Sequence, residues 1–199
     1  MAIRVGLNGF GRIGRSVFRI LHQRDDVDVV AVNDLFDNDQ LAYLLKFDTV
    51  MGVFPDEVRV AGDSMYAGGK EVVMTARSDP RQIPWRTLEV DYVIECTGVF
   101  RTREPLEKHL QAGARKVILT VPPKDEIDAM VVIGGHAALC SSDTPAPGRI
   151  LSIFPAGSDR SGQRKKRPRG QGRHTGSVTS GWEVGCRHRE AAWCRLALR

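Results

Sequence analysis

The chain of 199 residues predicts an α/β fold with a doubly wound, mostly parallel sheet. Two observations lead to this prediction. Apolar runs of strand length alternate with segments of helical period over roughly the first 135 residues, which is typical of parallel sheets covered by helices. The first apolar run also ends in a glycine-rich turn that opens a helical segment.

The expected elements follow in chain order. A helix over 11–23 is predicted because Ile13, Val17, Ile20 and Leu21 recur at the spacing of one helix face. A small β insertion is predicted from three short runs separated by glycine turns, 58–60, 64–66 and 71–74. The remaining elements are strands 2–8 and 27–33, helix 38–46, strand 90–96, helix 102–112 closed by Gly113, and strands 116–120 and 130–134.

The turn after the first strand has the spacing Gly9-x-Gly11-x-x-Gly14. Gly9 permits a tight turn, Gly11 lets the backbone approach a phosphate without a side chain in the way, and Gly14 lets helix and strand pack closely. The N–H groups and positive dipole end of the helix then face the anion. This pattern favours a Rossmann-type fold that binds a dinucleotide pyrophosphate.

An acid stands where the ribose partner of such a site is expected. Asp34 closes the second strand, about twenty residues beyond Gly14, and would accept hydrogen bonds from the adenosine ribose. Its charge would repel a 2′-phosphate, so the sequence favours NAD over NADP.

Several segments together resemble phosphorylating glyceraldehyde-3-phosphate dehydrogenases of glycolysis. They are collinear, cover roughly residues 1–135, and comprise residues 5–15, 31–34, 43–50, 77–80, 83–85, 94–100 and 109–118. The resemblance implies an NAD-binding domain in which Arg12 and Ile13 contact the pyrophosphate through backbone N–H groups. It implies that Arg77 borders the adenine, and that Thr97 and Thr120 line the path to the nicotinamide.

The catalytic run of that family, Ser-Cys-Thr-Thr-Asn-Cys, does not occur in this chain. Cys140 is the only cysteine near its expected place, and no base is paired with it, so we assign no catalytic residue. Cys96 is expected to be a buried thiol and not a nucleophile. The family reaction is NAD-dependent aldehyde oxidation, and we expect no turnover from this chain. Two alternatives stay open: a non-catalytic binding fragment with a polyanion-binding tail, and a fragment of an erythrose-4-phosphate dehydrogenase.

The charge divides the chain into an NAD-binding domain at 1–144 and a basic tail at 145–199. The tail holds twelve Lys and Arg against three Asp and Glu, whereas the whole chain has a net charge of +5. Its low apolar content over 157–180 predicts disorder, and the abrupt change of pattern suggests an out-of-frame reading. The basic run 164–169 is the only feature expected to contact nucleic acid.

The cysteine spacing and the length of the apolar runs argue against a metal-binding and a membrane-spanning protein. The four cysteines lack metal-ligand spacing and fit a reducing cytoplasm, so no metal is expected. No apolar run is long enough for a membrane span. Oligomerisation is doubtful on the sequence, because the family's tetramer uses surfaces largely outside the resembling segments.

Overall fold

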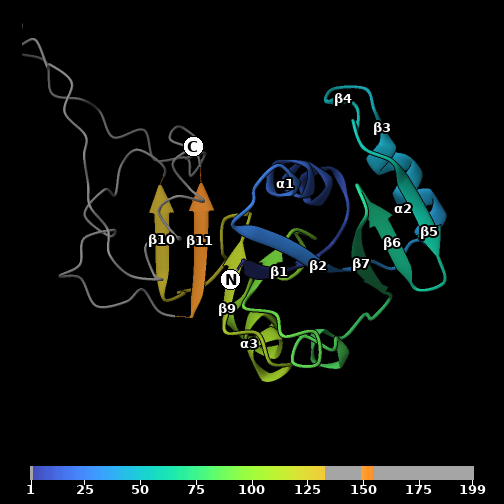
Figure 1. Ribbon diagram of the computed structural model, residues 1–199. Helices are drawn as coiled ribbons and strands as arrows, with labels where there is room; N and C mark the ends of the chain where they lie inside the picture. The colour runs from blue at the N-terminus through green and yellow to red at the C-terminus, as the bar shows by residue number, and fades with distance from the viewer. Residues whose placement is uncertain (1, 133–148, 155–199) are drawn as a thin grey trace, which may run out of the picture.

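The computed structural model describes residues 2–132 and 149–154, and Figure 1 shows how their elements are arranged. Nine strands among these residues form one sheet in the order β10-β11-β9-β8-β1-β2-β7-β6-β5. The strands of this sheet are β1 (Ile3–Asn8), β2 (Val27–Asn33), β5 (Val58–Ala61), β6 (Ser64–Ala67), β7 (Lys70–Thr75), β8 (Tyr92–Glu95), β9 (Lys116–Leu119), β10 (Ala129–Val132) and β11 (Ile150–Phe154). The other elements are α1 (Arg12–His22), α2 (Asn38–Lys46), α3 (Arg103–Gln111), a 3-10 turn at Pro80–Gln82, and a hairpin of β3 (Phe47–Asp48) and β4 (Gly52–Val53).

The central strands form the doubly wound arrangement that the sequence predicts. β1 pairs in parallel with β2 on one side and with β8 on the other, so the strand order reverses at β1. Helix α1 lies on one face of these strands and α3 on the opposite face (Figure 1). A reversal point of this kind leaves a crevice at the carboxyl ends of the strands, where ligands of α/β sheets bind.

Apolar burial holds the helices to the sheet. One cluster joins the β1 and β2 side chains to Phe18 and Leu21 of α1, and a second surrounds the fully buried Trp85. A third cluster lies beneath α3 and includes Leu106 and Val117. These clusters make the strand ends a rigid frame for the turns that follow them.

The predicted apolar face of α1 is wrong in two of its four residues. Ile13 and Ile20 are 49% and 57% exposed, whereas the buried residues of α1 are Gly14, Phe18, Arg19 and Leu21. Arg19 is buried because its guanidinium donates to the carbonyl oxygens of Leu45, Met51 and Gly52 at 2.5, 3.3 and 2.9 Å. Periodicity counts an arginine as polar, so the predicted apolar face included the exposed Ile13 and Ile20 and left out the buried Arg19, whereas Leu21 of that face is buried.

The predicted β insertion is continuous with the main sheet. β7 pairs in parallel with β2, and β6 and β5 extend the same sheet by antiparallel pairing. Gly113, expected to close the preceding helix, follows the C-cap of α3 and has a φ of +114°. This left-handed conformation favours glycine, as the sequence predicts.

β11 lies in the segment that the sequence assigned to the tail. It is parallel to both β9 and β10 and sits between them, with Ile150 and Leu151 buried. A five-residue strand is too short to stand out from the basic composition around it, and average composition therefore missed it. The rest of the predicted tail, including the basic run 164–169 and the disorder expected for it, lies outside the described residues.

Candidate functional site

Five parallel strands end side by side at one edge of the sheet, and backbone hydrogen bonds join the residues that follow them. The Gly9 N–H donates to Asn33 O at 2.8 Å, and the Cys96 N–H donates to Asn8 O at 2.8 Å. The Asp34 N–H donates to Thr75 O at 2.9 Å. Residues far apart in the chain thereby form one surface at the carboxyl ends of β7, β2, β1, β8 and β9.

The structure gives a different reason for glycine at each of the three positions of the turn. Gly9 has a φ of +92°, and a Cβ there would lie 2.8 Å from Thr97. A Cβ on Gly14 would collide with the carbonyl oxygen of Gly9, so glycine is what allows α1 to approach the turn. A Cβ on Gly11 would meet no heavy atom within 4 Å. The space in front of Gly11 is therefore open for a ligand, as the sequence predicts.

Helix α1 begins at this open space. Gly11 is its N-cap and makes no side-chain capping hydrogen bond, and Arg12 and Ile13 are exposed at the first turn. An N-terminus without a cap leaves N–H groups that an anion can accept from. The Arg15 guanidinium donates to Phe10 O at 3.0 Å and fastens the turn to the helix.

Asp34 has two main-chain partners that the sequence did not reveal. Its Oδ2 accepts from the Phe10 N–H at 2.6 Å, and its Oδ1 accepts from the Phe36 N–H at 3.1 Å. The carboxylate thus ties the end of β2 to the glycine turn. Since a carboxylate has about four acceptor positions, two remain for the hydroxyls of a ribose.

The other predicted site residues lie along the same edge. The main-chain N–H of Arg77 donates to Asn33 Oδ1 at 2.8 Å, and its side chain is exposed. Thr97 is exposed beside Gly9, and the Thr120 hydroxyl donates to Glu95 O at 2.9 Å. The structure therefore brings all nine predicted residues, from Gly9 to Thr120, to the carboxyl ends of the sheet.

Cys96 is held as a thiol. Burial raises its pKa to about 12, with a further contribution from the neighbouring Glu95 charge. The raised pKa agrees with the prediction that Cys96 is not a nucleophile, whereas the residue is half-buried and not fully buried as predicted. Cys140 lies outside the described residues.

Sequence reasoning missed a polar network beneath the site. Asn8, Asn33, Glu95 and His109 are buried, and hydrogen bonds join them to one another. The one available signal was that two strands end in asparagine, a residue depleted in strands. At these strand ends the asparagine side chains hydrogen-bond to groups beside the turns.

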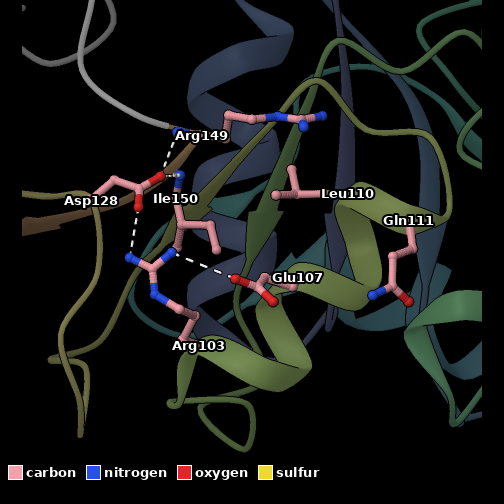
Figure 2. Close-up of a pocket in the computed structure, with 7 residues that line it drawn as sticks. All are labelled: Arg103, Glu107, Leu110, Gln111, Asp128, Arg149 and Ile150. Atoms are coloured by element: carbon pink, nitrogen blue, oxygen red, sulfur yellow. Dashed lines mark hydrogen bonds and ion pairs between the residues drawn. The ribbon is translucent and has the colours of Figure 1, made fainter.

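A separate hollow lies beside α3 and the start of β11, and Figure 2 shows the residues that line it. Arg103 is already bound there, to Asp128 at 2.6 Å and to Glu107 at 3.5 Å. The pair of Arg103 with Asp128 joins α3 to the segment before β10, whereas the pair with Glu107 lies within α3, so this hollow has a structural explanation. Within residues 2–132 and 149–154 no group of three or more His, Cys, Asp or Glu could hold a metal ion, and no helix is long and apolar enough to cross a membrane.

The fold and this edge define a dinucleotide-binding domain of the α/β class. A sequence model described as "Glyceraldehyde 3-phosphate dehydrogenase, NAD binding domain" matches residues 3–103. The chain belongs to this family, and NAD is the cofactor of the domain.

Similar proteins include three glyceraldehyde-3-phosphate dehydrogenases. The enzyme of Thermotoga maritima is 52% identical over 146 residues, which are 72% of this chain and 42% of the relative. That of Geobacillus stearothermophilus is 50% identical over 134 residues, 67% of this chain and 40% of the relative. The cytosolic enzyme of Trypanosoma brucei brucei is 45% identical over 136 residues, 68% of this chain and 41% of the relative. The chain thus spans about two fifths of the length of these curated relatives.

Proposed function

We propose that the carboxyl edge of the sheet binds NAD for the oxidation of a phosphorylated aldehyde, glyceraldehyde 3-phosphate. One observation carries the proposal: the open space at Gly11 lies directly before the uncapped start of α1. A pyrophosphate fits there because it needs close backbone approach and N–H donors. Bound NAD supplies a hydride acceptor at its nicotinamide ring.

We propose the following roles for the predicted residues. Arg12 and Ile13 donate their main-chain N–H groups to the pyrophosphate, and Gly9, Gly11 and Gly14 shape the turn around it. Asp34 accepts from the adenosine ribose, and Arg77 borders the adenine. Thr97 and Thr120 line the nicotinamide side, which is supported by their position at the ends of β8 and β9.

The cofactor choice gives a direct test of these roles. Titration of the full chain with NAD and NADP, followed by calorimetry, should show tighter binding of NAD. The reason is that the Asp34 carboxylate and a 2′-phosphate are both negative at neutral pH. Equal affinity for the two cofactors would refute the assigned role of Asp34.

The reaction requires groups that the described residues do not supply. We propose that NADH does not accumulate when the chain alone is given NAD, glyceraldehyde 3-phosphate and phosphate. The support is that the catalytic run of the family is missing from the sequence. Glyceraldehyde-3-phosphate-dependent absorbance at the NADH wavelength would contradict this.

We also propose that the NAD-binding domain includes β11, so that the basic segment begins after it. Pairing of β11 with β9 and β10 supports this boundary in place of one at residue 144. Limited proteolysis should then leave a product that contains Ile150–Phe154. A first stable cut before residue 149 would argue for the earlier boundary.

The cellular setting is proposed from the relatives. A cytoplasmic location is supported by the cytosolic enzyme among them, and cell fractionation would test it. Any binding of nucleic acid is assigned to the basic run 164–169, and a deletion of that run should abolish it.

A further inference from the structure

A buried polar network surrounds Glu95, whose side chain is fully buried. Its Oε2 accepts from Asn8 Nδ2 at 2.5 Å and faces His109 Nε2 at 3.2 Å. Its Oε1 accepts from the Thr97 N–H at 2.8 Å and from the Thr97 hydroxyl. Four groups therefore point at one carboxylate, which is the number of acceptor positions that it has.

The protonation of His109 follows from its other neighbour. Trp85 Nε1 lies 3.0 Å from His109 Nδ1, and an indole N–H can only donate. His109 Nδ1 must then accept, so the ring proton is on Nε2 and points at Glu95. This tautomer is assigned from the hydrogen bonds, and it leaves the imidazole neutral and Glu95 as the charged member of the pair.

Two independent sets of hydrogen bonds orient the side-chain amides of Asn8 and Asn33, and the orientations that they require agree. Glu95 requires the nitrogen of Asn8 on its side, so Asn8 Oδ1 faces Asn33 Nδ2, at 2.8 Å. Arg77 requires the same orientation of Asn33, because its main-chain N–H donates to Oδ1 at 2.8 Å and its carbonyl accepts from Nδ2 at 2.9 Å. One chain of oriented hydrogen bonds thus runs from Glu95 to the segment that carries Arg77.

The same network limits what Thr97 can offer a ligand. Its hydroxyl hydrogen goes to Glu95, and its oxygen accepts from the Val99 N–H at 3.1 Å. A hydroxyl has one donor and two acceptor positions, so one acceptor position remains. Thr97 can therefore accept from a hydroxyl or amide N–H of a ligand and cannot donate to it.

We propose that Glu95 is a positioning residue that sets both halves of the cofactor site: Thr97 directly on one side, and the Arg77 segment through Asn8 and Asn33 on the other. Glu95 touches no cofactor itself. The inference rests on the proposed function for its effect on NAD, whereas the positioning of Thr97 and Arg77 can be measured without ligand.

The test is Glu95→Gln in the full chain, which keeps the shape and replaces one acceptor oxygen by an amide donor. We expect at least tenfold weaker NAD binding by calorimetry and at least tenfold faster hydrogen exchange of the Thr97 and Arg77 amides by NMR. Glu104→Gln is the charge-matched control, because Glu104 is 87% exposed on α3. Val117→Ala is the stability control, because Val117 is buried in the apolar cluster beneath α3 and makes no side-chain hydrogen bond.

The outcomes separate positioning from stability. Unchanged amide exchange in Glu95→Gln would overturn the proposal, as would unchanged NAD affinity. The proposal would also fail if Val117→Ala weakened NAD binding as much as Glu95→Gln does, at the same loss of unfolding free energy. If the unaltered chain does not bind NAD, the proposed function fails, and the exchange of the two amides still decides the positioning role.

A second variant applies if Glu95→Gln does not fold. Asn8→Ala cuts the chain of hydrogen bonds between Glu95 and Asn33 but leaves the Thr97 contacts. Exchange of the Arg77 amide should then become faster while that of Thr97 stays near its original rate. Equal behaviour of the two amides in this variant would refute the directional chain.

Discussion

Gly14→Ala tests whether α1 approaches the glycine turn as closely as the structure shows. The new Cβ would collide with the carbonyl oxygen of Gly9, which belongs to the backbone and cannot swing aside. Alanine is favoured over glycine by about 1 kcal/mol in a helix interior, which is an upper bound for Gly14 in the first turn of α1. Overpacking in a filled site costs about 1–3 kcal/mol or more when backbone must move. We expect the clash to outweigh the gain in helix propensity, because Phe18 and Leu21 pack α1 against the sheet and prevent the helix from moving outward.

Because backbone must move here, we take the upper part of that cost, about 2–3 kcal/mol, and the expected net loss of unfolding free energy is then about 1–2 kcal/mol. For a domain of this size it corresponds to a fall in Tm of roughly 2–8 °C. Urea and thermal unfolding followed by circular dichroism would measure it, with the unaltered chain as reference. A variant as stable as the reference would refute the close contact and show that helix propensity dominates.

Three further predictions use other parts of the frame. Gly11→Ala should change stability by less than about 1 kcal/mol, since its Cβ meets open space, yet weaken NAD binding about 10- to 100-fold by blocking hydrogen bonds to phosphate; unaltered affinity in a calorimetric titration would contradict the pyrophosphate site. Arg19→Met should lower the unfolding free energy by about 2–4 kcal/mol in urea denaturation, because three carbonyl acceptors lose a buried charged donor, and a neutral result would show that water replaces it. The pKa of Cys96 is raised from 9.0 to about 12, so the thiol loses its proton at lower pH in the unfolded chain than in the folded one. The free energy of unfolding should therefore fall as pH rises from about 9 to 12. Cys96→Ala should flatten that part of the stability-against-pH curve, and an unchanged slope would exclude Cys96 as the cause.

Local patterns were sufficient for the part of the site that one segment builds. The spacing of Gly9, Gly11 and Gly14 predicted the turn, and Asp34 was predicted from its distance along the chain. These features follow from backbone conformation at a strand–helix junction, which neighbouring residues determine.

Contacts between distant segments could not be predicted from local patterns. The bond from the Phe10 N–H to Asp34, and the network of Glu95, Asn8 and Asn33, join residues from different strands. A single sequence does not say which buried polar groups face each other, because each has several partners of compatible chemistry.

The alternation of strands and helices, the glycine turn, the acid after the second strand and the family could all be inferred from the amino-acid sequence. The buried face of α1, the place of β11 between β9 and β10, and the donors around Glu95 became known only from the folded chain. The difference lies in the range of the interactions. Backbone propensity and apolar period act over a few neighbouring residues, whereas burial of Arg19 or Glu95 depends on partners that the fold brings from 26 or 87 positions away.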